Sequence, residues 1–284
     1  MKQTKQPLVS VIVLTRHTPL MILKRCISCI REQTYPNIEL LLLDLNEKNN
    51  KYYAAIHDDM EFLSDVIYIE KTGTNEFANE KNLAIEKANG DYITFLSAQD
   101  YMPPKRVEKV MQFFLQQRDS FAVYTPVKLN QSGLLEADTV NNISGKYSVL
   151  SQIFFHRNCF LLMGLFDPYL LGRCDDEMWL RIHLCHMECY CKDEDTCITA
   201  DPSFYNQRSS YHSAIGYQQM LVKNRALLRK QKNYTNMLYT QTAESCHTAG
   251  LLLHALQYYL KSFWHRRRYR AKHSKHHYHG KHSR

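Results

Sequence analysis

Acidic side chains stand at three points of the sequence where residue type and spacing suit chemistry. Asp44 ends an apolar segment, Asp100 follows another, and Asp175, Asp176 and Glu177 stand together where a segment of helical spacing begins. Carboxylate oxygens are the ligands that Mg²⁺ prefers, and a carboxylate can accept the proton of a hydroxyl group as that group attacks. Acids in the first turn of a helix also favour the helix dipole, so a structural role is the alternative for the third group.

The segments around the first two sites alternate between strand and helix over residues 9–125. The predicted strands are Val9–Leu14, Ile38–Asp44, Val66–Glu70, Tyr92–Leu96 and Phe121–Thr125, and the predicted helices are Leu20–Gln33, Asn79–Ala88 and Pro103–Gln117. This rhythm predicts an α/β fold with a mainly parallel central sheet flanked by helices. Because ligands bind such sheets at the carboxyl ends of the strands, we expect the segments 14–18, 44–50 and 97–101 to lie at a binding site.

The rhythm breaks after Val127, and residues 128–150 are polar with several turn-forming residues. A strand and two helices are predicted beyond them, at Gln152–His156, Asp175–Met187 and Gln218–Gln231. Nine cysteines and a polar N-terminus without a secretory signal predict a cytoplasmic protein whose thiols are free.

Positive charge is concentrated in the C-terminal extension. The 284-residue chain has a net charge of +8, and residues 261–284 contain nine Lys or Arg and no acid, so the remainder is close to neutral. Residues 249–264 are apolar on one side of a predicted helix but too polar for a transmembrane span. Two interpretations stay open: an amphipathic helix and basic tail on an anionic membrane surface, or a helix packed on the core with a solvated tail.

Four blocks of sequence resemble family 2 glycosyltransferases in their order and spacing. They are Val9–His17, Cys26–Asp44, Lys81–Leu96 with the following Asp100-Tyr101-Met102-Pro103, and Gly164-Leu165-Phe166-Asp167 with the following Asp175–Arg181. The resemblance covers about residues 8–230 and implies a GT-A (Rossmann-like) fold that binds a nucleotide sugar. It implies a donor-binding half, residues 8–127, an acceptor half, residues 128–230, and leaves 231–284 as a C-terminal amphipathic helix with a basic, His-rich tail.

The resemblance also implies roles for individual residues. The donor-binding candidates are Thr15, Asp44, Lys81, Asn82, Gln99, Asp100, Arg208 and His212. Where the family has an Asp-x-Asp motif for Mg²⁺ or Mn²⁺, this chain has Ser97-Ala98-Gln99-Asp100, so Asp100 is the candidate metal ligand, with a helix cap before Pro103 as its alternative. Leu45 replaces one of the paired acids that hold the nucleobase, and Lys81 has the alternative of a solvated helix charge.

The general base is implied by the last block. When Trp179 is aligned with the family's Trp, Asp175 takes the position of the general base, with Asp176 and Glu177 beside it as further catalytic candidates. Cys174 stands where the family has a preceding Glu.

The function implied is transfer of a sugar from a nucleoside diphosphate sugar to a hydroxyl of a glycan or a lipid-linked acceptor, with inversion. The alternative is a catalytically inactive GT-A domain that serves as a binding or scaffold protein, which the replaced acids favour. Nucleic acid is not an expected partner, because the body of the chain shows no basic stripe with interleaved aromatic residues. The expected location is the cytoplasm, with peripheral attachment to the cytoplasmic face of the membrane as the alternative.

Overall fold

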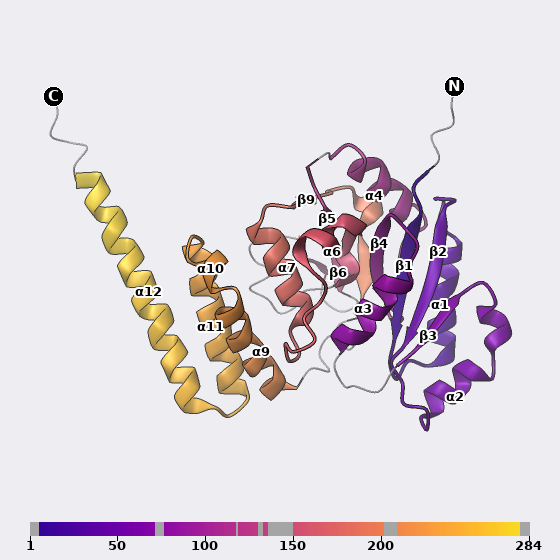
Figure 1. The fold of residues 1–284 in the computed structure, drawn as a ribbon, viewed down its shortest axis with the longest axis horizontal. Coiled ribbons are helices and arrows are strands. Elements are labelled where there is room, and N and C mark those ends of the chain that lie inside the picture. The colour runs from indigo at the N-terminus through magenta and orange to yellow at the C-terminus, as the bar shows by residue number, and fades with distance from the viewer. Residues whose placement is uncertain are drawn as a thin grey trace.

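The structure is a computed structural model that describes residues 6–71, 77–117, 119–129, 133–135, 150–201 and 209–278 (Figure 1). Its centre is a seven-stranded sheet in the order β3-β2-β1-β4-β8-β5-β9. The strands are β1 Val9–Thr15, β2 Ile38–Asp44, β3 Ile67–Glu70, β4 Tyr92–Ser97, β5 Ala122–Tyr124, β8 Ile153–His156 and β9 Glu188–Tyr190. A smaller sheet has the order β10-β6-β7, with β6 Val127–Leu129, β7 Gly133–Leu135 and β10 Ile198–Ala200.

The central sheet is mainly parallel, as predicted. β1 pairs in parallel with β2 and β4, and β2 pairs in parallel with β3. β8 is antiparallel to both of its neighbours, β4 and β5. β1 is buried at all seven positions, which explains its nearly continuous apolar sequence.

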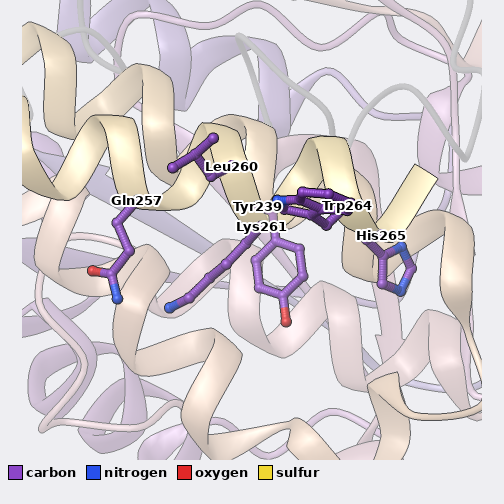
Figure 2. Close-up of a pocket in the computed structure, with 6 residues that line it drawn as sticks. All are labelled: Tyr239, Gln257, Leu260, Lys261, Trp264 and His265. Carbon is purple, nitrogen blue, oxygen red and sulfur yellow. The ribbon is translucent and has the colours of Figure 1, made fainter. Parts of the chain in front are cut away.

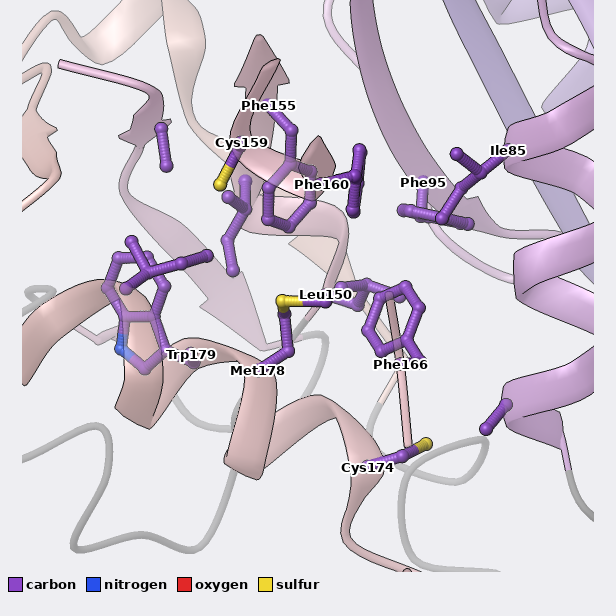
Figure 3. Packing of buried hydrophobic residues seen from close by; sticks show 14 of the residues in the cluster. Ile85, Phe95, Leu150, Phe155, Cys159, Phe160, Phe166, Cys174, Met178 and Trp179 are labelled. Atoms are coloured by element: carbon purple, nitrogen blue, oxygen red, sulfur yellow. The ribbon is translucent and has the colours of Figure 1, made fainter. Parts of the chain in front are cut away.

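Helices cover both faces of this sheet. They are α1 Leu20–Arg31, α2 Lys51–His57, α3 Phe77–Lys87, α4 Arg106–Phe114, α6 Arg157–Met163 and α7 Cys174–Leu184, with 3₁₀ turns at Met60–Leu63, Leu150–Gln152 and Glu194–Thr196. α1 and α4 pack with Val9, Val11 and Val13 on one face. α3, α6 and α7 pack with Ile12 and Leu14 on the other, where Figure 3 shows Phe166 next to Met178, and Phe95 next to Ile85 of α3. The alternation of side chains along β1 therefore divides the core in two.

The C-terminal region is helical, with α9 Ser210–Lys223, α10 Arg225–Leu228, α11 Lys232–Thr248 and α12 Leu252–Tyr278. The predicted helix Gln218–Gln231 is wrong as a single helix, because α9 ends at Lys223 and α10 begins at Arg225. The Asn224 side chain between them donates to the Glu177 carboxylate and to the Met220 carbonyl. α11 is not apparent from the sequence, and α12 runs well beyond the predicted 249–264. None of the helices in the described part of the chain is long and apolar enough to cross a membrane.

Candidate active site

The carboxyl ends of β1, β2 and β4 meet at one edge of the sheet. Thr15 is paired in register with Asp44, and Leu14 with Ser97. The three segments expected at a binding site are therefore neighbours. α3 begins after the carboxyl end of the next strand, β3, so Lys81 and Asn82 approach the same edge.

Asp44 is buried in a network of hydrogen bonds at this edge. Its Oδ1 accepts from the backbone N–H and the Nδ2 of Asn46, at 2.9 and 2.7 Å, and its Oδ2 accepts from the Tyr68 hydroxyl at 2.6 Å. Asn46 Oδ1 in turn accepts from the His17 backbone N–H at 2.7 Å. Burial raises the pKa of Asp44, while the hydrogen bonds from Tyr68 and Asn46 oppose this rise. The network joins the loops after β1 and β2.

Thr15 and Leu45 are joined by a backbone hydrogen bond beside this network, and one side chain is polar while the other is apolar. The Thr15 backbone carbonyl accepts from the Leu45 N–H at 2.9 Å, but the buried Thr15 hydroxyl has no hydrogen-bond partner among the described residues. A buried hydroxyl without a partner costs free energy, so a ligand atom that bonded to it would be favoured. Leu45 is 3% exposed and belongs to the apolar core, which accounts for the loss of an acid at this position.

Asp100 is fully buried, and both of its oxygens are used inside the protein. Oδ2 accepts from the Ser151 hydroxyl at 2.6 Å and from the Ser97 N–H at 3.3 Å, and Oδ1 accepts from the Asp201 N–H at 3.0 Å. Asp100 does not cap α4, which begins at Arg106 with Lys105 at its N-cap. Gln99 is half-buried, and its backbone carbonyl accepts from Arg25 at 3.4 Å.

The negative charge of Asp100 helps to stabilise the positive charge of Arg106, which is buried in the core. The guanidinium is fully buried, and it donates to the carbonyls of Ser151, at 2.7 Å, and Thr196. Burial lowers the pKa of Arg106 to about 10, and the charge of Asp100 opposes that fall. The Asp100 carboxylate at the end of β4 is therefore committed to protein donors, which fits poorly with a role as the main ligand of a cation.

Lys81 and Asp175 form a buried ion pair. Their side chains are 6% and 10% exposed, and the Lys81 ammonium donates to Asp175 Oδ1. The ammonium also lies 3.8 Å from the Cys174 thiol and 5.2 Å from the centre of the Phe166 ring. Two sequence-predicted site residues, 94 positions apart, thus meet where the α3 and α7 segments face each other.

Asp176 and Glu177 bind other partners. Asp176 pairs with Arg173 at 3.0 Å. The Glu177 side chain has no exposed surface and pairs with Arg181 at 3.0 Å and with Lys223 at 3.2 Å. Arg181 also donates to the carbonyl of Leu165 at 2.9 Å. Glu177 and Arg181 therefore fix the loop after α6, whereas Asp175 is joined to α3 through Lys81.

Asn82 connects α3 to the same loop. Its Nδ2 donates to the Phe166 carbonyl at 2.8 Å, and its Oδ1 accepts from the Phe166 N–H at 3.0 Å. This reciprocal pair sets the distance between α3, which carries Lys81, and the chain that leads into α7. Asn82 thus positions the ion pair.

His212 is exposed at the start of α9, next to the loop that precedes Asp175. Gly172 has a φ of 63°, and a Cβ there would lie 3.3 Å from His212 Cβ. Gly216, one turn further along α9, packs so closely that a Cβ would lie 2.1 Å from the Leu171 carbonyl oxygen. Arg208 lies outside the described residues.

Several side chains that shape the site are not apparent from the sequence. Tyr68 and Asn46 hold Asp44, Ser151 holds Asp100, and Arg173 stacks on Tyr217 at 4.4 Å while it pairs with Asp176. A local signal exists only for the contact between Asp44 and Asn46, since an Asp side chain commonly accepts from the backbone N–H two residues on. The others come from segments distant in sequence.

Comparisons with known proteins bear on the family and the fold of the chain. A profile described as Glycosyl transferase family 2 matches residues 10–174, more than half of the chain. An uncharacterized glycosyltransferase of Haemophilus influenzae is 32% identical over 117 residues, which are 39% of this chain and 43% of that protein. The Escherichia coli UDP-Glc:alpha-D-GlcNAc-diphosphoundecaprenol beta-1,3-glucosyltransferase WfgD is 29% identical over 140 residues, which are 47% of this chain and 49% of that protein. The matches thus span less than half the length of these curated relatives.

A solved structure extends the comparison over most of the chain. The mannosyltransferase PcManGT from Pyrobaculum calidifontis, in complex with GDP-Man and Mn²⁺, superposes with a TM-score of 0.59 and 17% identity, covering 89% of this chain and 75% of that one. At this identity the likeness shows the GT-A fold alone.

Proposed function

The chain belongs to glycosyl transferase family 2, and on that premise we propose that it transfers a sugar from a nucleoside diphosphate sugar to a hydroxyl of a glycan or lipid-linked acceptor, with inversion. The observation that carries the proposal is the buried contact between Lys81 and Asp175. It joins the donor half to the acceptor half beside the edge of the sheet where nucleotides bind in this class of fold.

The donor is proposed to lie over the carboxyl ends of β1, β2 and β4. The unpartnered Thr15 hydroxyl and the Asp44 carboxylate would face the nucleoside, and Lys81 and Gln99 would approach the diphosphate. His212, at the start of α9, is proposed to contact the diphosphate, and Arg208 is proposed as a further donor-binding residue. The relatives support a donor of this class, since WfgD is named for UDP-Glc and PcManGT was solved with GDP-Man.

Asp175 is proposed as the general base. As the acceptor oxygen bonds to the anomeric carbon, the bond from that carbon to the diphosphate oxygen breaks, and the hydroxyl proton passes to the Asp175 carboxylate. A single displacement from the opposite face inverts the anomeric centre. A positioned base of this kind typically accelerates a reaction about 10²–10⁴-fold.

Mg²⁺ or Mn²⁺ is proposed to be carried by the donor diphosphate, where it would neutralise the charge of the leaving group. Asp100 is the acid of this chain at the family's metal position, but its oxygens already accept from Ser151, Ser97 and Asp201. Ser97 and Gln99 add no charge. The ion would therefore depend on phosphate and water oxygens for most of its ligands.

A second candidate function is a GT-A domain that binds donor or acceptor without turnover and acts as a scaffold in glycan assembly. The same burial of Asp100, together with Leu45 in the core, favours it. Both candidates place the protein in the cytoplasm, where nucleotide sugars would be supplied, and a lipid-linked acceptor would add the cytoplasmic face of a membrane.

The test is release of nucleoside diphosphate from a panel of nucleotide sugars, with and without Mn²⁺. The enzyme proposal expects release from one donor and a loss of about 10² or more in Asp175→Asn. Asp176→Asn is the comparison variant, because it removes the neighbouring carboxylate, which pairs with Arg173, and so tests Asp176 as the alternative base. Saturable donor binding with no release, with or without candidate acceptors, would instead support the scaffold.

A further inference from the structure

One face of α12 leaves a continuous apolar stripe uncovered. The stripe consists of Leu252, Leu253, Leu256, Tyr259, Leu260, Phe263 and Trp264, which are between 42% and 82% exposed. Their spacing of one, three and four residues places them along one side of a helix. A contiguous apolar surface of this kind marks an interaction site rather than ordinary surface variation.

The opposite face of α12 accounts for its packing on the protein. Ala255 is buried in a small cluster with Ala214 and Cys246. Ser262 is buried and shares hydrogen bonds of 3.0 Å with Thr240 and Asn236 of α11. Figure 1 shows α12 at the outer edge of the molecule, with α10 and α11 between it and the central sheet. The stripe is therefore not needed to hold α12 in place.

The charged residues of the C-terminal segment that carries the stripe are all basic. No Asp or Glu follows Glu244, and nine Lys or Arg lie between Lys261 and Arg284. The helix itself carries the stripe into this basic segment without a break. A partner that covers the stripe must therefore be both apolar and anionic.

A recess lies along the edge of the stripe, between α11 and α12. It has a volume of about 590 Å³ and is lined by Tyr239, Gln257, Leu260, Lys261, Trp264 and His265. Figure 2 shows Lys261, Tyr239 and His265 side by side, next to Trp264. The Lys261 ammonium lies 4.3 Å from the centre of the Tyr258 ring, and the Arg267 guanidinium lies 5.6 Å from that of Trp264. Cations beside amphipathic aromatic rings suit the depth at which lipid headgroups begin.

We propose that α12 docks on the surface of an anionic lipid bilayer, with its apolar stripe among the acyl chains and the basic residues at the phosphates. Each basic residue close to such a surface strengthens binding about fivefold, and each buried apolar side chain adds to this. A second copy of the chain is the less favoured occupant, because a parallel pairing along the stripe would bring two acid-free basic segments together. The proposal does not depend on sugar transfer.

The experiment is co-sedimentation of the full chain with vesicles of phosphatidylglycerol and phosphatidylcholine, and with vesicles of phosphatidylcholine alone. Wild type is expected to bind the mixed vesicles at low salt, and at least about tenfold more weakly at high salt or without the anionic lipid. Leu256→Glu is expected to lower the partition coefficient at least about tenfold. The matched control is Leu115→Glu at the C-terminal end of α4, since Leu115 is 54% and Leu256 57% exposed, and it should bind like wild type.

Thermal unfolding checks that both variants are folded, and Leu253→Glu, at an 82% exposed position, replaces Leu256→Glu if that variant is not. Absence of binding by wild type would overturn the proposal. Equal losses of vesicle binding in Leu256→Glu and in the control Leu115→Glu would overturn it as well. Sedimentation equilibrium without lipid supplies the remaining outcome. A wild-type dimer that Leu256→Glu converts to monomer would assign the stripe to a second copy and overturn the membrane proposal.

Discussion

Lys81 and Asp175 show how one contact can serve both stability and chemistry. Each is nearly inaccessible to solvent, so each charge depends on the other. Removal of one partner from a buried pair typically costs about 3–5 kcal/mol, because the remaining charge is left without compensation. A loss of activity in a single variant at this pair therefore has two causes, catalytic and structural, which only a cycle of variants separates.

We expect Asp175→Asn to lose both stability and nucleoside diphosphate release. Lys81→Met with Asp175→Asn removes both charges of the pair, so the free energy of unfolding should recover by about 1–3 kcal/mol relative to Asp175→Asn. Release should stay low, because the base is still absent. Urea unfolding and the release assay measure the two quantities, and a double variant with wild-type release would exclude Asp175 as the base.

Asp100 is predicted to act first through the core. In Asp100→Asn an amide N–H₂ replaces an oxygen that accepts from Ser151 or Asp201, and the countercharge near Arg106 is lost. We expect the free energy of unfolding to fall by about 1–3 kcal/mol. The Mn²⁺ concentration for half-maximal release should stay close to that of wild type. An increase of an order of magnitude or more in that concentration would instead assign Asp100 to the metal.

At the scale of elements, Glu39 ties the start of β2 to β1 and to the turn before β4. Its carboxylate accepts from the Ser10 hydroxyl and from the backbone N–H groups of Asn89 and Gly90. Gly90 permits this approach, since a Cβ there would lie 2.7 Å from the Ser10 backbone nitrogen. Partial burial raises the pKa of Glu39, but the hydrogen bonds outweigh burial and hold the pKa below its ordinary value.

This pKa gives a prediction with a definite sign. A carboxyl whose pKa is lower in the folded chain stabilises the fold above its unfolded pKa, about 4.3, and loses that contribution as the pH falls through the folded pKa. Glu39→Gln should therefore lower the melting temperature at pH 7, and the difference from wild type should shrink as the pH falls below about 5. Melting curves over this pH range make the measurement. A difference that is constant with pH would mean that ionisation of Glu39 does not matter.

The sequence predicts those elements whose environment is uniform along their length. β1 to β4 are apolar runs between turn residues, and their parallel pairing confirms the prediction. The sequence does not predict α11, because the apolar residues of this helix are few and spread around it. The predicted single helix Gln218–Gln231 is wrong because Asn224, which contacts Glu177, ends α9. At the site, the family resemblance supplies Lys81 and Asp175 as candidates but not the ion pair between them. The contacts of Tyr68 and Ser151 likewise depend on tertiary packing that no local pattern encodes.

At the scale of the whole molecule, α12 is the peripheral element of the C-terminal region, since α9, α10 and α11 contribute Tyr217, Leu228 and Leu238 to the main core. α12 packs on α11, with Ala255 as its buried anchor and Ser262 in a polar contact. The residues proposed for donor binding and catalysis all precede α10. The proposed catalysis and the proposed docking on a membrane thus belong to different parts of the chain.

A chain that ends at Thr248 is expected to keep donor release within about twofold of wild type on a soluble acceptor, since no proposed site residue is removed. Its free energy of unfolding should fall by about 1–3 kcal/mol, because Ala255 and Ser262 no longer cover α11. The release assay and urea unfolding test this. Loss of release from a truncated chain with a native circular dichroism spectrum would place α12 in the catalytic machinery.

The position of β8 has a consequence for how the protein is made. β8 lies between β4 and β5, yet it is synthesised after both of them. Until residues 153–156 leave the ribosome, the backbone of β4 has an open edge, and such edges recruit other strands. Residues 8–127 therefore expose an unpaired strand edge in this interval, and a fragment cut at residue 127 would keep that edge and its risk of aggregation.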